Sequence, residues 1–330
     1  MSDDPVKRPA WPQSASRPVV TPISPSVVFA SHSPAALDAQ YDGSAPGYTY
    51  SREGHPNASV LAAKLDGLEG ATGGFVTGSG MAAVTVALLG LLGQGDHVIG
   101  GDQLYGRSLR LLTQDLPRFG IKATLADPTD VDAMRAAIQP RTRAILVEVV
   151  SNPTLRVADM AGITQLARDH GLILIVDNTF TTPRAYRPLD HGADVVVHSV
   201  TKLLAGHADV MAGYVGAQQA ELTQKMLDLS VTMGFTASPF DCWLGERGLM
   251  SFALRFDKAQ DNARLLADHL ATLPGIRRVL YPMRPDHPDH NRAVALLDGQ
   301  GGHMVSFEVA GGRAAAEALV QAAPSIAFAP

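Results

Sequence analysis

The 330-residue sequence has one cysteine, Cys242, and no long run of lysine or arginine. A single cysteine cannot form a disulfide within the chain, and it leaves no cysteine cluster for a structural zinc. Cys242 is therefore expected to be a small core residue. The formal net charge of -5 and the pI near 6.1 argue against a nucleic-acid-binding surface. These features predict a small-molecule partner and no nucleic acid.

The sequence also has no apolar run long enough to span a membrane. The stretch 82–92 is short, contains Gly90 and is soon followed by Gly93. The first eighteen residues are polar and rich in proline, unlike the basic start and apolar centre of a signal peptide. We therefore expect a cytoplasmic protein with no membrane partner.

What the sequence contains is a long alternation of short apolar runs and helix-like segments. The apolar runs are 97–99, 123–125, 144–150, 171–176 and 195–198, and the longest helix-like segments between them are 81–92, 104–119 and 160–170. This alternation predicts an α/β fold, with a mostly parallel central sheet covered by helices on both faces. The runs 145–147 and 172–176 are continuously apolar, which places them in the middle of the sheet.

The ends of the sequence differ from this pattern. Residues 1–47 are rich in proline and serine, which predicts an extended N-terminal arm that packs on a neighbouring subunit. A helix over 60–69 should follow, capped by Asn57 or Ser59. We expect a large domain over 48–250 and a smaller α+β domain over 251–330, the latter beginning with a charged helix at 253–273.

The residues that suggest chemistry are Asp177, which ends one apolar run, and Lys202, which lies in a cluster of hydroxyls where the run over 195–198 stops. The chain between them is long enough for one crossover, so both can reach the carboxyl edge of a parallel sheet, where ligands bind. Pyridoxal phosphate (PLP) needs a lysine for its Schiff base and an acid that keeps the pyridine nitrogen protonated. The pair therefore predicts a PLP site.

A phosphate site is predicted beside this pair. Gly78, Ser79, Gly80 and Met81 precede a helix, whose first N–H groups and dipole attract an anion. Ser199 and Thr201 are two residues apart on an extended stretch, so both hydroxyls can face the same side. Arg52 is a candidate countercharge.

Simpler readings exist for each of these features. A lone lysine after a strand is usually a surface residue, and an aspartate there often caps the next helix. The stretch 78–83 also has the GxGxxA form of a dinucleotide-binding turn, with Asp96 or Asp102 as the ribose-binding acid. That turn should open the fold, whereas here a polar arm and a helix precede it. The histidines lack metal-ligand spacing, so we predict no metal and expect His198 to pack beside the lysine.

Taken together, the motifs resemble the Cys/Met-metabolism family of PLP-dependent enzymes. This family includes cystathionine γ-synthase, the cystathionine γ- and β-lyases, methionine γ-lyase and the O-acyl-homoserine sulfhydrylases. The resemblance runs from near residue 20 to the last residue. The matching stretches are Tyr50 to Arg52, Ser79 to Met81, Tyr105-Gly106, Asn152-Pro153, Val176 to Thr179, His198 to Lys202 and Gly206-His207.

The resemblance implies PLP-dependent transferase fold type I and a homotetramer built from active dimers. It implies that Lys202 carries the Schiff base and moves protons, that Asp177 pairs with the pyridine nitrogen, and that Tyr105 stacks on the cofactor ring. The implied phosphate ligands are Ser79, Gly80, Met81, Ser199 and Thr201, with Tyr50 and Arg52 contributed by a neighbouring subunit. Asn152 is implied near the cofactor oxygen and the substrate carboxylate.

Three departures from the family pattern stand out. His55-Pro56-Asn57 replaces the usual Asn-Pro-Thr, and Arg107 follows Tyr105-Gly106 where cysteine or glycine is usual. Arg107 makes methioninase activity less expected and favours a substrate with a distal carboxylate. The chain ends at Pro330, before the family's Ser-Leu-Gly segment and the arginine that holds the substrate carboxylate, so we expect an incomplete C-terminal domain.

The function expected from the resemblance is the making or breaking of a carbon–sulfur bond in a sulfur amino acid. A γ reaction, the synthesis or cleavage of cystathionine, is the first expectation. A β-elimination of the cystathionine β-lyase type is the second. A third is a protein that binds PLP without turnover, because the site for the substrate carboxylate is missing.

Overall fold

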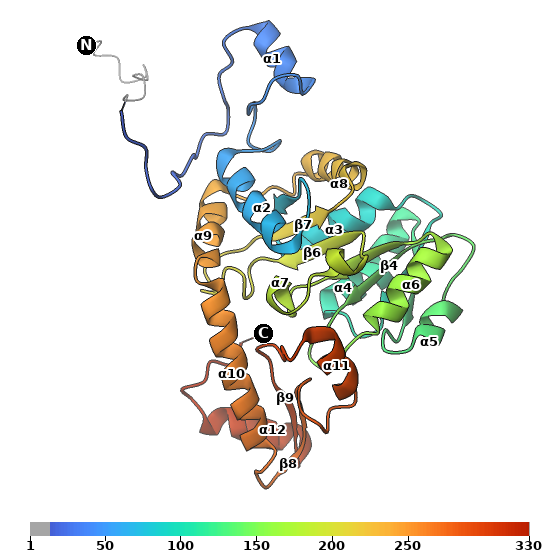
Figure 1. The fold of residues 1–330 in the computed structure, drawn as a ribbon. Helices are drawn as coiled ribbons and strands as arrows, with labels where there is room; N and C mark the ends of the chain where they lie inside the picture. The colour runs from blue at the N-terminus through green and yellow to red at the C-terminus, as the bar shows by residue number, and fades with distance from the viewer. Residues whose placement is uncertain (1–13, 330) are drawn as a thin grey trace.

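A seven-stranded sheet forms the centre of the computed structural model, which describes residues 14–329 (Figure 1). In spatial order its strands are β1 (Phe75–Thr77), β7 (Gly213–Ala217), β6 (Val195–Ser199), β5 (Ile173–Asp177), β4 (Thr142–Glu148), β2 (His97–Gly101) and β3 (Lys122–Ala126). The strands from β6 to β3 pair in parallel, whereas β7 is antiparallel to both β6 and β1. The expected α/β fold with a mostly parallel sheet is confirmed.

The central strands are buried on both faces. Along β4, Ile145 and Val147 join one hydrophobic core, while Ala144 and Leu146 join the core on the other side of the sheet. The first core includes residues of α2 (Pro56–Glu69), α5 (Val131–Ala136), α6 (Met160–His170) and α9 (Pro239–Leu249). The second includes residues of α3 (Gly80–Leu91) and α8 (Ala220–Met233). Cys242 is fully buried in the first core, as expected.

The start of α2 differs from the sequence expectation. The N-cap is His55, whose Nδ1 accepts the N–H of Ala58 at 3.2 Å, so the prediction of Asn57 or Ser59 is wrong. Pro56 explains the shift, because proline suits the first helical position. The buried Asn57 instead binds the arm, since its side chain accepts the N–H of Ser24 and donates to the carbonyl of Pro22.

The helix-like segment expected over 104–119 is helical from Gly106 to Phe119, but the type of helix changes along it. The segment contains α4 (Gly106–Arg110), a π-helical turn (Leu111–Asp115) and a 3-10 turn (Leu116–Phe119). Pro117 has no N–H to donate and would clash with the carbonyl four residues earlier, so a regular α-helix cannot continue through this position.

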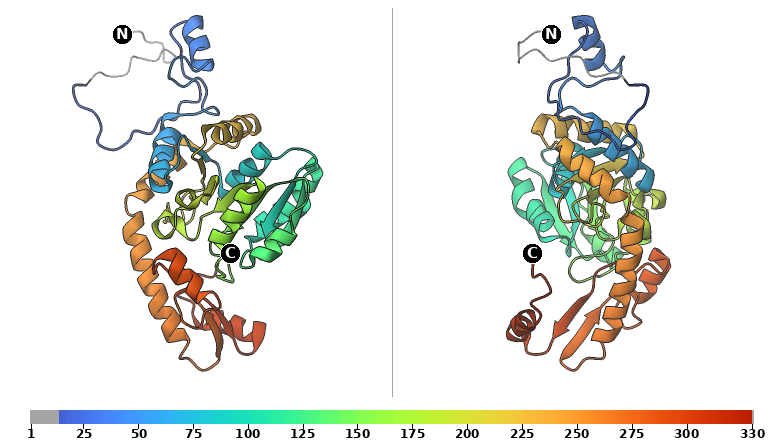
Figure 2. Two further views of the ribbon diagram at one scale, coloured as in Figure 1. Left: turned by 45° about the vertical axis from the view of Figure 1, so that its right-hand side comes forward. Right: turned by 90° about the vertical axis from the view of Figure 1, so that its left-hand side faces the viewer.

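The described part of the N-terminal arm, residues 14–47, stands away from the sheet in every view (Figures 1 and 2). It is mostly extended but contains the short helix α1 (Pro34–Tyr41), which the sequence did not suggest. Val19, Val20, Val27 and Val28 are exposed on it. Residues 1–13 of the expected arm lie outside the described residues.

The C-terminal part is reached through the long helix α10 (Phe252–Leu270), which runs away from the large sheet (Figures 1 and 2). Here β8 (Ile276–Leu280) and β9 (Ser306–Val309) form a small antiparallel sheet, accompanied by α11 (His290–Leu297) and α12 (Gly312–Ala322). The remaining short elements are α7 (Thr182–Ala185) and a 3-10 turn (Pro188–His191). Within residues 14–329, no helix combines the length and apolarity that a membrane crossing needs.

Candidate active site

Asp177 lies at the carboxyl end of β5, in register with Glu148 of β4 and Val197 of β6. Its Oδ1 accepts the N–H of Thr179 at 3.0 Å and the hydroxyl of Thr179 at 2.5 Å. Burial raises the pKa of Asp177 above its usual value, while both Thr179 bonds and the charge on His198 lower it. A cationic ring nitrogen at this carboxyl would favour the charged form further.

Lys202 lies in the turn that follows β6, and its side chain is exposed. The same turn begins beside Asp177, because the Thr179 hydroxyl also accepts the N–H of Ser199 at 2.9 Å. Thr179 thus joins the ends of β5 and β6. The hydroxyl of Thr201 bonds to the backbone of Ala212, donating to its carbonyl at 3.2 Å and accepting its N–H at 3.1 Å.

The start of α3 packs against the end of β6. Ser79 is the N-cap of α3, and its hydroxyl accepts the N–H of Ala82 at 3.1 Å. A Cβ atom added to Gly80 would lie 2.5 Å from the Cβ of Ser199, so only glycine allows this approach. The N–H groups of Gly80 and Met81 belong to the first turn, which lacks intrahelical acceptors. This arrangement fits a phosphate bound between a helix N-terminus and Ser199.

Tyr105 immediately precedes α4, with 46% of its surface exposed. Its N–H donates to Oε1 of Glu148 at 2.7 Å. Glu148 is only 6% exposed, and burial raises its pKa well above the usual range, with the charge of Asp177 adding to the effect. Its Oε2 has no hydrogen-bond partner among residues 14–329. Burial and the charge of Asp177 thus both favour the protonated form of Glu148.

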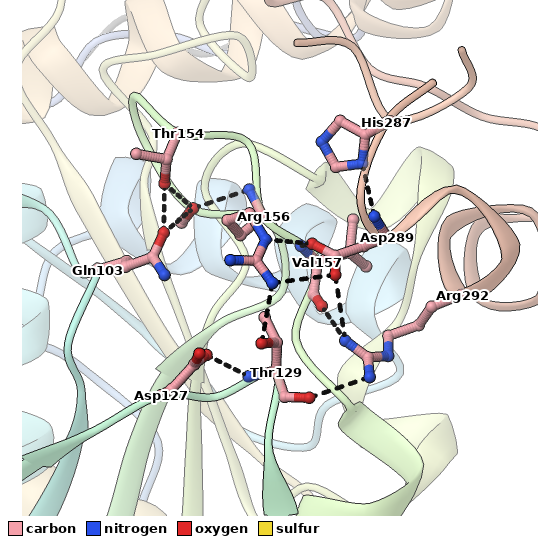
Figure 3. Close-up of polar contacts among 10 residues, drawn as sticks. Gln103, Asp127, Thr129, Thr154, Arg156, Val157, His287, Asp289 and Arg292 are labelled. Carbon is pink, nitrogen blue, oxygen red and sulfur yellow. Dashed lines mark hydrogen bonds and ion pairs between the residues drawn. The ribbon is translucent and has the colours of Figure 1, made fainter. Parts of the chain in front are cut away.

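Asn152 lies on the loop that follows β4, and a polar network holds this loop (Figure 3). The hydroxyl of Ser151 bonds to Thr154 at 2.7 Å and accepts the N–H of Arg156 at 3.0 Å. Gln103 accepts a hydrogen bond from Thr154. The loop is thereby fixed next to the segment that leads to Tyr105.

The C-terminal part completes this network through Asp289. Its carboxylate accepts hydrogen bonds from Nε and Nη2 of Arg156 at 2.6 and 3.2 Å, and from the N–H of Val157 at 3.0 Å (Figure 3). Arg292 donates to the carbonyls of Val157 and Thr129 at 2.9 and 3.0 Å. Burial would raise the pKa of Asp289, but the bonds from Arg156 and Val157 outweigh it and hold the pKa below its usual value. We call these contacts the Asp289 clasp.

The other candidates lie on exposed surface. Arg107 is an exposed residue of α4. Tyr50 forms a β-bridge with Val28 of the arm, and the guanidinium of Arg52 lies 5.2 Å from the centre of the Tyr50 ring. Tyr50 and Arg52 therefore belong to the arm region, whereas the other candidates come from the carboxyl ends of the strands, the turns that follow them and the start of α3.

Sequence reasoning missed three polar residues near these strand ends. Thr179 had a recognisable signal, since a hydroxyl two residues after an aspartate often forms a local turn. Glu148 had none, because it simply ends an apolar strand. Glu69 of α2 was also missed: it pairs with His198 and accepts a bond from Asn178 at 2.8 Å, all three being buried. His198 is thus hydrogen-bonded to a buried carboxyl, whereas only a packed neighbour of the lysine was expected.

The residues fit PLP on their own geometry. The edge provides an exposed lysine, a half-buried carboxylate with its own donors, a tyrosine ring and a helix N-terminus that a single added Cβ would obstruct. The lysine would hold the amine-reactive carbon of PLP and the carboxylate its pyridine nitrogen. The tyrosine would cover the ring face, and the helix N-terminus would bind the phosphate.

Comparison with known proteins agrees with this geometry. Residues 6–330 match the family model described as "Cys/Met metabolism PLP-dependent enzyme". The probable cystathionine γ-synthase of Herpetosiphon aurantiacus is 40% identical over 309 residues, which is 94% of each chain. The solved structure of MetB from Corynebacterium glutamicum is 35% identical with a TM-score of 0.90, and the match covers 95% of this chain and 79% of that one.

A further solved structure bears on the cofactor. The putative O-acetylhomoserine (thiol)-lyase of Campylobacter jejuni was solved with a pyridoxyl-lysine monophosphate. It is 28% identical, with a TM-score of 0.86, and the match covers 89% of this chain and 81% of that one. With a family match over nearly its whole length, the chain belongs to the PLP-dependent enzymes of Cys/Met metabolism.

Proposed function

We propose that this enzyme makes or breaks the carbon–sulfur bond at the γ-carbon of a sulfur amino acid, as a cystathionine γ-synthase or γ-lyase does. The observation that best supports the proposal is the hydrogen-bonded series from Asp177 through Thr179 to Ser199, which ties the acid to the start of the lysine turn. The similarity to a probable cystathionine γ-synthase along 94% of the chain favours the γ reaction.

In this proposal Lys202 is the base and acid of the reaction. Bound PLP supplies a ring that accepts electrons from the substrate. The Lys202 amine removes the proton from the substrate Cα and then one from Cβ, whose electron pair lets the γ substituent leave with its bonding electrons. Protons are later returned to these carbons by the same amine. Asp177 accepts a hydrogen bond from the pyridine N–H, and its negative charge keeps that proton in place.

The remaining candidates bind and orient. Tyr105 covers one face of the ring, and Ser79, Gly80, Met81 and Ser199 bind the phosphate. Thr201 joins them when its hydroxyl turns from the carbonyl of Ala212 to the phosphate. Asn152 lies near the cofactor oxygen and the substrate carboxylate. Tyr50 and Arg52 reach the same phosphate from a neighbouring subunit of a homotetramer. Arg107, which is exposed next to Tyr105, attracts the distal carboxylate of the substrate.

The proposal extends to organisation and location. We infer a large cofactor-binding domain over 48–250 and a small domain over 251–330, with α10 running into the small one. We infer a cytoplasmic enzyme that acts on free amino acids.

The test has two stages. The protein is mixed with PLP, and the visible absorbance of the bound cofactor is compared with that of Lys202→Ala, which should lack it. O-succinylhomoserine with cysteine, and then cystathionine, are supplied and the products are identified. Cystathionine from the first pair, or 2-oxobutanoate with cysteine from the second, supports γ chemistry.

Other outcomes of this test contradict the proposal. Pyruvate with homocysteine would instead mean β-elimination. Cofactor absorbance without any product would leave a PLP-binding protein without turnover. An Arg107→Ala enzyme with unchanged KM for these substrates would exclude the role given to that residue.

A further inference from the structure

The turn that carries Lys202 is held on one side by its own strand neighbours. The N–H of Thr201 donates to the carbonyl of Ala212 at 3.2 Å. Within the turn, the N–H of Ala205 donates to Val200 at 2.9 Å and that of Gly206 to Lys202 at 2.8 Å. These bonds fold residues 200–206 into a compact turn but leave the carbonyls of Leu203 and Leu204 to find partners elsewhere.

Arg255 of α10 supplies those partners. Its Nη1 donates to the carbonyl of Leu203 at 2.6 Å, and its Nη2 donates to the carbonyl of Leu204 at 3.0 Å. Nη2 also reaches the carbonyl of Gly248 at 2.8 Å, and Nε donates to the hydroxyl of Ser251 at 3.1 Å. One guanidinium therefore joins the lysine turn to the junction of α9 and α10.

Two glycines allow this close approach. Gly206 has a φ of +74°, and a Cβ atom there would overlap the guanidinium of Arg255. A Cβ atom on Gly248 would overlap the carbonyl of Ala205. The turn and the junction are therefore packed backbone against backbone, and the guanidinium fills the space beside them.

We propose that Arg255 is a positioning residue for Lys202. The inference rests on the role given to Lys202 in the proposed function. Arg255 does not reach the reacting atoms. It fixes the two carbonyls that follow the lysine, and so limits the positions from which the Lys202 amine can reach a substrate proton.

The charge and the shape of arginine both matter here. A charged donor forms stronger bonds to carbonyl oxygens than a neutral donor does. The planar fork of arginine can serve several acceptors at once, whereas the single ammonium of lysine cannot hold the same set of directions. Because α10 also leads to the C-terminal part, Arg255 links that part directly to the lysine turn.

A purely structural role is the competing explanation, since Arg255 also binds the end of α9. The test therefore compares Arg255→Lys and Arg255→Met with Arg184→Ala. Arg184 of α7 is the control, because it also binds α10. It donates to the carboxylate of Asp257 at 3.0 and 3.1 Å and forms no hydrogen bond with the lysine turn.

Amide hydrogen exchange is measured first, on the cofactor-free proteins. Both Arg255 variants should exchange faster at residues 203–206, while exchange in α9 and in the rest of α10 stays close to the wild type. Arg184→Ala should leave residues 203–206 unchanged. Wild-type exchange at 203–206 in Arg255→Met would overturn the proposal, as would an equal increase across α9, α10 and the turn.

Kinetics are measured second, on the PLP-loaded proteins. We expect kcat to fall about tenfold to a hundredfold in the Arg255 variants with little change in KM, because the reacting amine is misplaced while substrate binding is retained. An unchanged kcat would overturn the proposal. If the wild type does not bind PLP or turn over, the proposed function fails, whereas the exchange measurement still decides whether Arg255 holds the turn.

Discussion

Two carboxyls, the buried Glu148 and the half-buried Asp177, lie in register at the ends of β4 and β5, and burial raises the pKa of both. Asp177 receives two hydrogen bonds from Thr179, which favour its carboxylate. Glu148 receives backbone hydrogen bonds from Tyr105 and Asn152, but burial and the charge of Asp177 raise its pKa well above the usual range. The Thr179 hydroxyl gives Asp177 an additional side-chain donor, which favours the charged form of the residue that would face a pyridine nitrogen.

Thr179 is where this division of roles can be tested. Thr179→Val removes one donor to Asp177 and leaves the N–H of Ser199 without its acceptor. Since the hydroxyl bond from Thr179 lowers the pKa of Asp177, its loss should raise that pKa and favour the protonated acid as the pH falls. We expect PLP affinity to drop about tenfold, in line with the loss of one hydrogen bond to a charged group.

The measurement is a titration of cofactor-free protein with PLP at several pH values. The loss should be larger at the acidic end than at the alkaline end. Thr179→Ser keeps the hydroxyl and serves as the control. An equal, pH-independent loss in both variants would show that Thr179 acts through packing alone.

At the scale of elements, the Asn152 loop and the lysine turn are both fixed by residues from the C-terminal part. Asp289 binds Arg156 and Val157 at the end of the loop, and Ser306 of β9 donates to the carbonyl of Pro153 at 2.6 Å. The part of the chain beyond residue 251 thus contacts two of the segments that carry candidate site residues.

We expect the Asp289 clasp to stabilise the folded protein. Asp289→Asn should lower the free energy of unfolding by about 2–4 kcal/mol at pH 7, because it leaves a partly buried arginine without its anionic partner. The pKa of Asp289 is lowered in the folded protein, so its contribution is complete above the unfolded value near 3.8 and is lost as the pH falls through the folded value.

Urea unfolding at several pH values between 7 and 3 checks this. The gap between wild type and Asp289→Asn should be constant down to about pH 5 and then shrink. Asp257→Asn breaks an exposed ion pair with Arg184 and should cost less than about 1 kcal/mol. A gap that widens in acid would contradict the direction of the pKa shift.

Over the whole molecule, the sequence predicted the parts in which apolar pattern alone decides the structure. The continuous runs of β4 and β5 led to the parallel sheet, and Asp177 and Lys202 followed from where runs end. The strand β7 was missed because Gly213 and Gly216 interrupt its apolar pattern. The Asp289 clasp was also missed, because its partners are 132 and 133 positions apart and no local pattern links them.

The N-terminal arm has exposed apolar residues that are suited to packing on another subunit. Val19, Val20, Val27 and Val28 are exposed on it, and Val28 pairs with Tyr50. Such a surface is usual where one subunit packs on another. This exposure is consistent with the proposed homotetramer, in which Tyr50 and Arg52 would reach the cofactor phosphate of a neighbouring subunit.

A mixing experiment tests that arrangement at the scale of the assembly. Lys202→Ala and Arg52→Ala should each be nearly inactive alone. If each site takes Lys202 from one chain and Arg52 from another, equal mixing with exchange of subunits should restore about a quarter of the wild-type sites, since half of the dimers are mixed and each has one intact site. Activity is measured before and after the two proteins are unfolded and refolded together. No recovery, with mixed dimers demonstrated by different affinity tags, would mean that Lys202 and Arg52 serve the same site from one chain.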